Sequence, residues 1–224
     1  AAGGSEMKLW TDTRFERAHR FYEKQGYVRG GPLRVLGDLS NSLEFAYAKP
    51  LSGVVVRRLD AAGAASAEGG LAGLLRDCVA EGPALGFLPP LEPAAARAYW
   101  RQRTIEVAIG ERVLLVAWVD GVLAGSVMLQ LETMPDQPHA AHVQKMMVAP
   151  SLRRRGVARR LMLAVEAEAR LARRALLTLS GRAGDPAEAL YRALGWVEYG
   201  RIAGFALNAA GRFEDEVFFA KRLG

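Results

Sequence analysis

Residues 146–162 read MMVAPSLRRRGVARRLM and join an apolar strand pattern to an apolar helix pattern. Between them, Arg153, Gly156 and Ala158 follow the spacing R-x-x-G-x-A. A loop that leads into a helix gathers free backbone N–H groups and the positive end of the helix dipole. Glycine lets this backbone approach a bulky anion, and a small residue two positions later keeps its side chain clear. The stretch therefore predicts an anion site, and a pyrophosphate held by the arginines would suit it.

The positive charge of the chain is concentrated around this stretch. The 224 residues carry a formal charge of +6, and residues 151–174 hold eight arginines and two glutamates, which alone gives +6. Such a local field indicates an anionic partner, either a phosphorylated small molecule or nucleic acid. Charge runs are usually solvated faces. We therefore expect no special role for the basic side chains of Lys145, Arg159, Arg160, Arg170, Arg173 and Arg174.

Composition limits the class of protein. Half of the residues are apolar, which suffices for one generous core or two small ones. The sequence contains no long apolar run that would predict a membrane span, and its start, AAGGSEMKLW, lacks the pattern of a secretory signal. A single cysteine, Cys78, cannot form an internal disulfide, which predicts a reducing, cytoplasmic location. Its helix pattern predicts a buried thiol that is not a nucleophile.

An internal repeat divides the chain. RAHRFYEKQGYV, residues 17–28, aligns with PAEALYRALGWV, residues 186–197, so that Tyr22 meets Tyr191 and Gly26 meets Gly195. EFAYAKPL, which ends at Leu51, aligns in the same way with EVFFAKRL near the end of the chain.

The repeat predicts a partial domain over residues 1–51 and a complete domain over residues 52–224. About fifty residues that end in strands cannot cover a sheet alone. We therefore expect the first segment to dock on the complete domain or on another subunit, as in a homodimer.

The complete domain shows the order β-α-α-β-β-β-α-β-α-β-β, which predicts an α/β fold with one mixed, curved sheet flanked by helices. Asp120-Gly121 joins two apolar runs and is the strongest hairpin signal in the chain. Before the last two strands, the expected strands are 54–59, 112–119, 122–133, 139–148 and 174–180, and the expected helices are 69–82, 92–110, one from residue 157, and 186–194.

These motifs resemble those of the GNAT acetyltransferases. The family signature R/Q-x-x-G-x-G/A is matched by RRRGVA, and its element A-x-x-x-Y-x-x-x-G-[FYW] by Ala187, Tyr191, Gly195 and Trp196. The resemblance covers residues 54–224, and residues 7–51 are similar to the end of a second such domain. Within the family, the last hundred residues are similar to the bacterial tabtoxin-resistance acetyltransferases.

The resemblance implies acetyl-CoA as co-substrate and no metal. The pyrophosphate would lie on the N–H groups of residues 154–159 and the pantetheine arm along strand 144–148. A bulge or splay after Met147 would leave the Val148 N–H to stabilise the oxyanion. The implied cofactor-binding residues are Met146, Met147, Val148, Arg153, Arg154, Arg155, Gly156, Val157, Ala158, Arg159 and Tyr191.

Tyr191 is where the family places a tyrosine beside the departing sulfur, so a catalytic acid is implied, with an aromatic core residue as the alternative. Relatives are expected to carry carboxylates at the positions of His142 and Ser180, and this sequence has neither. His142 is the predicted base because imidazole titrates near neutrality, although a structural histidine is common in strands.

Other residues have weaker claims to a role. Glu132, Asp136 and Glu198 are reserve bases, and His139 belongs to a turn. Tyr99 and Trp100 lie where relatives line the acceptor pocket, but core packing is the commoner fate of such aromatics.

The predicted function is transfer of an acetyl group from acetyl-CoA to a primary amine of a small molecule, an antibiotic or toxin by resemblance. A non-catalytic acyl-CoA sensor is an alternative, because the expected carboxylates are missing. A basic nucleic-acid-binding module is a third, weakened by the lack of aromatic residues among the arginines. No membrane partner is expected.

Overall fold

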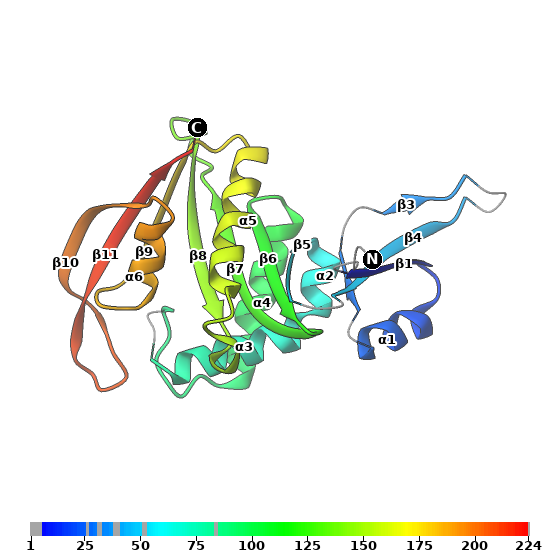
Figure 1. Ribbon diagram of the computed structural model, residues 1–224, viewed down its shortest axis with the longest axis horizontal. Coiled ribbons are helices and arrows are strands. Elements are labelled where there is room, and N and C mark those ends of the chain that lie inside the picture. The colour runs from blue at the N-terminus through cyan, green and yellow to red at the C-terminus, as the bar shows by residue number, and fades with distance from the viewer. Residues whose placement is uncertain are drawn as a thin grey trace.

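The computed structural model of the chain describes residues 6–25, 27–30, 33–37, 41–50, 53–82 and 85–223. These residues form one sheet of four strands and one of seven (Figure 1). Gly26 and Leu51, which the repeat alignment uses, lie outside the described residues. Within the part of the chain that is described, no helix is long and apolar enough to cross a membrane.

The seven-stranded sheet has the order β10-β11-β9-β8-β7-β6-β5. Its strands are β5 (Val54–Leu59), β6 (Arg112–Val119), β7 (Val122–Leu131), β8 (Ala140–Val148), β9 (Leu176–Arg182), β10 (Val197–Leu207) and β11 (Phe213–Arg222). All neighbouring pairs are antiparallel except β8 and β9, which are parallel. The predicted α/β fold with a mixed sheet is thereby confirmed.

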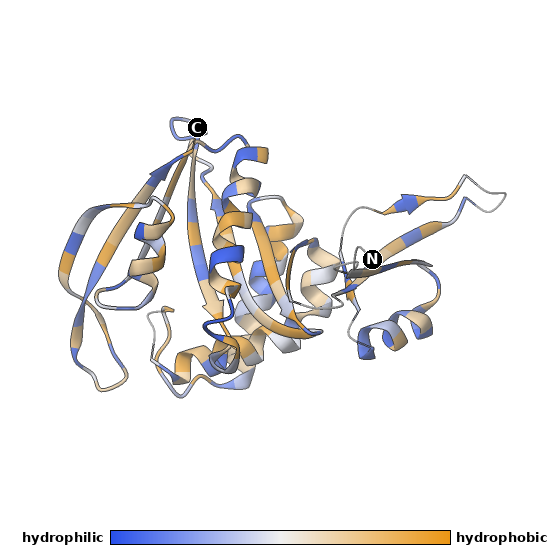
Figure 2. Cartoon of the chain, viewed as in Figure 1, coloured by the Kyte–Doolittle hydropathy of each residue, from blue (hydrophilic) through white to orange (hydrophobic). Residues whose placement is uncertain are grey.

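Helices cover both faces of this sheet. They are α2 (Ala61–Ser66), α3 (Glu68–Ala80), α4 (Pro93–Ala108), α5 (Val157–Leu171) and α6 (Ala187–Ala193). On one face, buried residues of the sheet pack against α5 and Tyr191 of α6, and this group is called the first core cluster. On the other face, Leu71 of α3 and Trp100 of α4 belong to the second core cluster. Strand β6 is buried along its whole length because both faces are covered. Figure 2 shows the apolar residues gathered on β6, β7 and the helices that flank them.

Two predictions about elements need correction. A separate helix, α2, precedes the expected helix near residue 69, and the Asp60 side chain caps it by accepting a hydrogen bond from the Gly63 N–H at 2.7 Å. The strand expected at 174–180 runs instead from Leu176 to Arg182. Arg173 has a φ of 56°, and this left-handed residue extends the turn after α5.

The four-stranded sheet is built from the N-terminal segment. Its elements are β1 (Glu6–Asp12), α1 (Glu16–Lys24), β2 (Val28–Arg29), β3 (Arg34–Val35) and β4 (Leu43–Pro50). Strand β4 is antiparallel to β1 on one side and to β2 and β3 on the other. The segment β9-α6-β10-β11 has the same connectivity, with its last strand between the other two.

The helix ends of these two segments also agree. The Tyr27 N–H donates to the Tyr22 carbonyl at 3.0 Å, as the Trp196 N–H does to the Tyr191 carbonyl at 3.0 Å. The two turns therefore close in the same way, with each tyrosine carbonyl accepting from the residue five positions later.

The small sheet lies against the start of the larger domain. Val28 packs on the second core cluster, and the Ser66 hydroxyl donates to the Glu23 carboxylate at 3.4 Å. A Cβ added to Gly63 would lie 3.4 Å from the Arg29 carbonyl, so the backbones approach closely at this point. The contacts join β2 and α1 to α2.

Candidate active site

A fork opens where β8 and β9 separate. The two strands pair only from Ala140 and Leu176 to His142 and Thr178. Beyond that rung β8 continues to Val148 and β9 to Arg182 without pairing to each other, as Figure 1 shows. Parallel strands that part in this way leave backbone N–H and C=O groups free along their facing edges.

Strand β8 carries a β-bulge inside the fork. Ser126 pairs with Met147 and Met128 pairs with Gln144, so Lys145 and Met146 together face Val127 alone. Lys145 has a φ of 51°, in the left-handed region. The expected bulge after Met147 is therefore wrong, because the extra residue lies before Met147.

Gly125 makes room for this bulge. A Cβ at Gly125 would lie 2.5 Å from the Met147 carbonyl oxygen, 3.1 Å from Leu161 and 3.2 Å from Val157. Only a residue without a side chain fits between the bulged strand and α5.

Val148 presents its backbone to the fork. It lies opposite Gly125, and the Ala149 N–H donates to the Ala124 carbonyl at 2.8 Å. In an antiparallel ladder this arrangement makes Val148 part of a non-hydrogen-bonded pair, so its own N–H and C=O point away from β7. The Cys78 thiol contacts the Val148 carbonyl at 3.5 Å.

The methionines of this strand have different surroundings. Met147 is buried in the core beneath α3, and Met146 packs against the opposite cluster. Their side chains therefore serve packing. Met147 precedes Val148 in the ladder and forms a hydrogen-bonded pair with Ser126, so its N–H and C=O point toward β7 and not into the fork.

The arginine loop ends in an uncapped helix start. Gly156 is the N-cap of α5 with a φ of 80°, and no side chain caps this helix. The first intrahelical bond runs from the Arg160 N–H to the Gly156 carbonyl at 3.1 Å, which leaves the N–H groups of residues 157–159 without helical acceptors. No acidic residue lies in the first turn of α5.

The arginines of this loop are exposed. Arg153 is 3.5 Å from Glu81, and Arg155 is 3.5 Å from Asp120, both in solvent-exposed pairs. Arg154 has a φ of 63°, so this non-glycine residue and Gly156 both adopt left-handed conformations before the helix. The side chain of Val157 is buried in the core, so it can offer a ligand only its N–H. Exposed cations, free N–H groups and a helix N-terminus thus meet at one point.

His142 stands at the last rung before the fork opens. Its Nδ1 lies 2.9 Å from the Thr178 hydroxyl. Burial, with the positive charges of Arg112 and Lys145, lowers the pKa of His142 below its usual 6.5. The imidazole is therefore neutral at neutral pH and able to accept a proton.

Tyr191 is 6% exposed and packs edge-on against Phe219, with Trp196 near its ring. Burial raises the pKa of Tyr191, and the nearby Asp185 adds to this effect. The phenol thus keeps its proton at physiological pH.

A buried polar cluster lies across the sheet on the α4 side, and the sequence did not indicate it. Arg112, 5% exposed, donates to Glu106 at 2.6 Å, to Gln144 at 2.8 Å and to Gln130 at 3.2 Å. In the strand register, Arg112, Gln130, His142 and Thr178 form one row across β6, β7, β8 and β9. Four strands must be aligned to see this row, so no local pattern could have shown it.

Lys145 does not lie on a solvated face, contrary to expectation. Its Nζ is 5.8 Å from the centre of the Phe87 ring and 5.6 Å from that of Tyr99. Burial, Arg112 and Arg103 lower the pKa of Lys145. The bulge in β8 directs this lysine toward α4 and the loop after α3.

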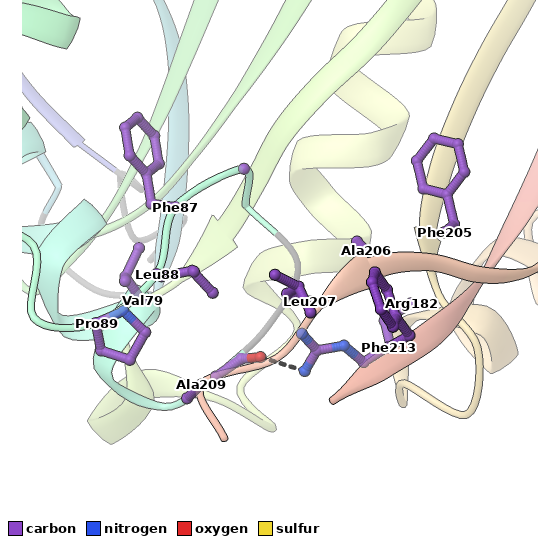
Figure 3. A pocket seen from close by; sticks show the side chains of 12 residues that line it. Val79, Phe87, Leu88, Pro89, Arg182, Phe205, Ala206, Leu207, Ala209 and Phe213 are labelled. Carbon is purple, nitrogen blue, oxygen red and sulfur yellow. Dashed lines mark hydrogen bonds between the residues drawn. The ribbon is translucent and has the colours of Figure 1, made fainter. Parts of the chain in front are cut away.

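A pocket of about 430 Å³ lies between the loop after α3 and the β10–β11 hairpin. Figure 3 shows Val79, Phe87, Leu88 and Pro89 along one wall, with Leu207 and Phe213 along the other. Arg182, at the end of β9, lies between them and is bonded to the Gly82 carbonyl and the Glu214 carboxylate. This pocket was not predicted from the sequence, and the aromatic residues of the hairpin segment GFALNAAGRF are a signal that could have found it.

The remaining candidates lie elsewhere or are occupied. Glu132 and Asp136 are in the loop before β8, and Glu198 on β10 pairs with Arg192 and Arg201. Ser180 lies on β9 opposite Phe218 of β11. The His139 carbonyl accepts hydrogen bonds from the backbone at the start of β9.

Two core residues are settled by their burial. Trp100 is 1% exposed and belongs to the core rather than to the pocket. Cys78 is buried, and burial raises the pKa of its thiol to about 11, as expected of a cysteine that is not a nucleophile.

Residues 84–196 match the family described as the acetyltransferase (GNAT) family. Over 108 residues the chain is 37% identical to an uncharacterized N-acetyltransferase from the hisH-hisA intergenic region of Azospirillum brasilense. This alignment covers 47% of the chain and 62% of that relative, so the match spans less than two thirds of the relative's length.

Solved structures share the fold at low sequence identity. An N-acetyltransferase from Staphylococcus aureus Mu50 is 15% identical with a TM-score of 0.65, over 77% of this chain and 100% of that one. A putative acetyltransferase from Salmonella typhimurium, solved with acetyl-CoA, is 16% identical with a TM-score of 0.62, over 77% of this chain and 95% of that one.

Proposed function

This chain belongs to the GNAT acetyltransferase family, and on that premise we propose that it transfers an acetyl group from acetyl-CoA to a primary amine of a small molecule. The observation that carries the proposal is the uncapped N-terminus of α5 beside the open fork of β8 and β9. The putative acetyltransferase from Salmonella typhimurium was solved with acetyl-CoA, which supports the same donor here.

The residues present fit acetyl-CoA. A Cβ built at Gly156 would have no atom within 4 Å, so a ligand has room beside this residue. The N–H groups of residues 157–159 have no helical acceptor and can donate to an anion. A diphosphate there would also pair with Arg153 and Arg154. The edge of β8 that faces the fork would bond the amide-containing arm of the donor.

Three groups have proposed catalytic roles in acetyl transfer. His142 takes a proton from the acceptor ammonium, and the amine nitrogen then forms a bond to the thioester carbonyl carbon. The Val148 N–H stabilises the negative charge that develops on the carbonyl oxygen. As the carbon–sulfur bond breaks, Tyr191 donates its proton to the departing sulfur, and solvent returns a proton to the phenolate.

The acceptor is proposed to occupy the pocket between the α3 loop and the β10–β11 hairpin. Cys78 contacts the Val148 carbonyl, and the next residue, Val79, lines the pocket. This continuity supports a pocket beside the proposed oxyanion site. Its apolar walls favour an acceptor with an apolar body.

One charge-matched pair of variants tests the donor site. Asn and Asp both tolerate the left-handed conformation of Gly156, and both cap helices, but only Asp adds a negative charge. We expect Gly156→Asp to weaken acetyl-CoA binding at least about tenfold more than Gly156→Asn, measured by calorimetry. Equal affinities of the two variants would contradict an anion site at Gly156.

A second measurement separates an enzyme from a sensor. The protein is incubated with acetyl-CoA and a library of amines while free thiol is followed. Thiol release that depends on an amine supports transfer, whereas tight acetyl-CoA binding with no thiol release supports an acyl-CoA sensor.

For the N-terminal segment, we propose that residues 1–51 are a partial copy of the same fold. Support comes from the shared strand connectivity and from the equivalent turns at Tyr22 and Tyr191. Its contacts with α2 favour docking on the complete domain. If limited proteolysis released residues 1–51 without lowering the melting temperature of the remainder, docking would be refuted.

A further inference from the structure

Lys145 is a cation next to two residues of the proposed acceptor pocket. A Cβ built at Gly86 would lie 3.6 Å from the Lys145 Nζ, and the Phe87 ring is 5.8 Å from it. Gly86 and Phe87 both line the pocket. The lysine therefore contacts this wall of the pocket from behind, from the bulge of β8, the same strand that carries Val148.

The charges around Lys145 do not balance. Arg103 and Arg112 share the carboxylate of Glu106, at 2.5 Å and 2.6 Å. Among the described residues, Lys145 has no carboxylate within ion-pair distance, and its ring contacts with Phe87 and Tyr99 stabilise a cation without neutralising it. The group thus holds three cations against one anion.

Such an arrangement disfavours a purely cationic acceptor. A partly buried cation without a partner is costly, and an anion that enters the site relieves this cost. An acceptor with a single ammonium and no anionic group would instead add a fourth positive charge. The Arg103 Nε is also buried with no hydrogen-bond partner among the described residues, which leaves a donor beside Lys145 unused.

We propose that the acceptor is an amine that also carries a carboxylate or a similar anionic group, and that Lys145 binds this anion while the apolar pocket holds the rest of the molecule. This inference rests on the proposed acetyl transfer and narrows its acceptor class. Apolar amino acids have the required combination of amine, carboxylate and apolar body.

The test compares acids with their neutral counterparts. Leucine, phenylalanine and their β- and γ-homologues are each paired with the corresponding amide and offered to the full chain with acetyl-CoA. In the preferred pair, we expect kcat/KM to be at least about tenfold higher for the acid than for the amide. The difference should lie mainly in KM, because the amide cannot form the ion pair with the Lys145 ammonium. Lys145→Met should reduce this ratio to near one, and Lys145→Arg should retain most of it.

A matched control removes a different cation. Arg101 is an exposed residue of α4 that pairs with Glu68 at 3.8 Å. Arg101→Met should keep the acid preference of the unmodified chain. If Arg101→Met also lost the preference for acids, the preference would come from the general positive potential of the protein, and the role of Lys145 would be overturned.

Binding is also measured without turnover, by titrating each acid and amide into the protein saturated with CoA. The inference is overturned if no acid binds more tightly than its amide, or if Lys145→Met lowers kcat equally for acids and amides. Transfer to amides with no preference for acids would overturn this inference and leave the proposed function intact. Failure to bind acetyl-CoA would overturn the proposed function instead.

Discussion

The indole N–H of Trp196 donates a hydrogen bond to the buried carboxylate of Glu166 at 3.0 Å. The other carboxylate oxygen accepts from Lys221 at 2.7 Å, and the Lys221 Nζ also donates to the Leu194 carbonyl at 2.6 Å. The network ties α5 and β11 to the C-terminal end of α6. It thereby fixes the helix that carries Tyr191.

Glu166→Ala should destabilise the fold strongly. Glu166 is 3% exposed, and its removal would leave the Lys221 ammonium unpaired in a largely buried setting. Losing one partner of a buried pair costs about 3–5 kcal/mol of unfolding free energy. Chemical denaturation measures the change. Glu168→Gln on the same helix, which breaks an exposed pair with Arg58, should cost less than about 1 kcal/mol, and equal losses would contradict a special role for Glu166.

Gly125→Ala should distort the bulge of β8. The new methyl group would lie 2.5 Å from the Met147 carbonyl oxygen, a distance that backbone atoms must relieve by moving. We expect a loss of about 1–3 kcal/mol in unfolding free energy and weaker acetyl-CoA binding. Gly73→Ala is the control, since nothing lies within 4 Å of its Cβ and the residue is within α3. It should stabilise the protein by about 0.5–1 kcal/mol, so the two glycines should respond with opposite signs.

Local patterns predicted the elements better than they predicted the site. The hairpin at Asp120-Gly121 and the helix that starts after Gly156 follow from turn chemistry and apolar periodicity. The bulge at Lys145 arises because β8 has one residue more than β7 between their paired positions. No residue type in the sequence predicts this extra residue. It turned Lys145, expected in solvent, toward the rings of Phe87 and Tyr99. Contacts between distant strands decide such positions, and a single sequence does not show them.

His142 predicts a pH dependence of both rate and stability. The pKa of His142 in the folded protein lies below the usual 6.5 of an unfolded chain. Between the lowered pKa and 6.5, the unfolded chain therefore binds more protons than the folded chain. The unfolding free energy should therefore decrease as pH falls below about 6.5. If His142 is the base, as proposed, kcat/KM should hold at neutral pH and fall only below the lowered pKa of His142.

The variant His142→Gln should lower kcat by about 100-fold and remove the acid limb of the pH profile. It should also flatten the dependence of stability on pH in this range. His139→Gln, in the exposed loop before β8, serves as the control and should change neither profile. An unaltered turnover of His142→Gln between pH 6 and 9 would exclude His142 as the base.

Tyr191→Phe tests whether the phenol acts on the departing sulfur or only fills the core. The ring contacts with Phe219 and Trp196 survive the substitution, so unfolding free energy and acetyl-CoA affinity should change little. Without a proton donor, kcat should fall by about 100-fold. Because the pKa of Tyr191 is raised, the unmodified enzyme should keep this donor protonated up to at least about pH 10. Tyr22→Phe removes the hydroxyl at the equivalent position of the N-terminal segment and should leave kcat unchanged. If Tyr191→Phe kept the full kcat while its melting temperature dropped, the tyrosine would be a core residue only.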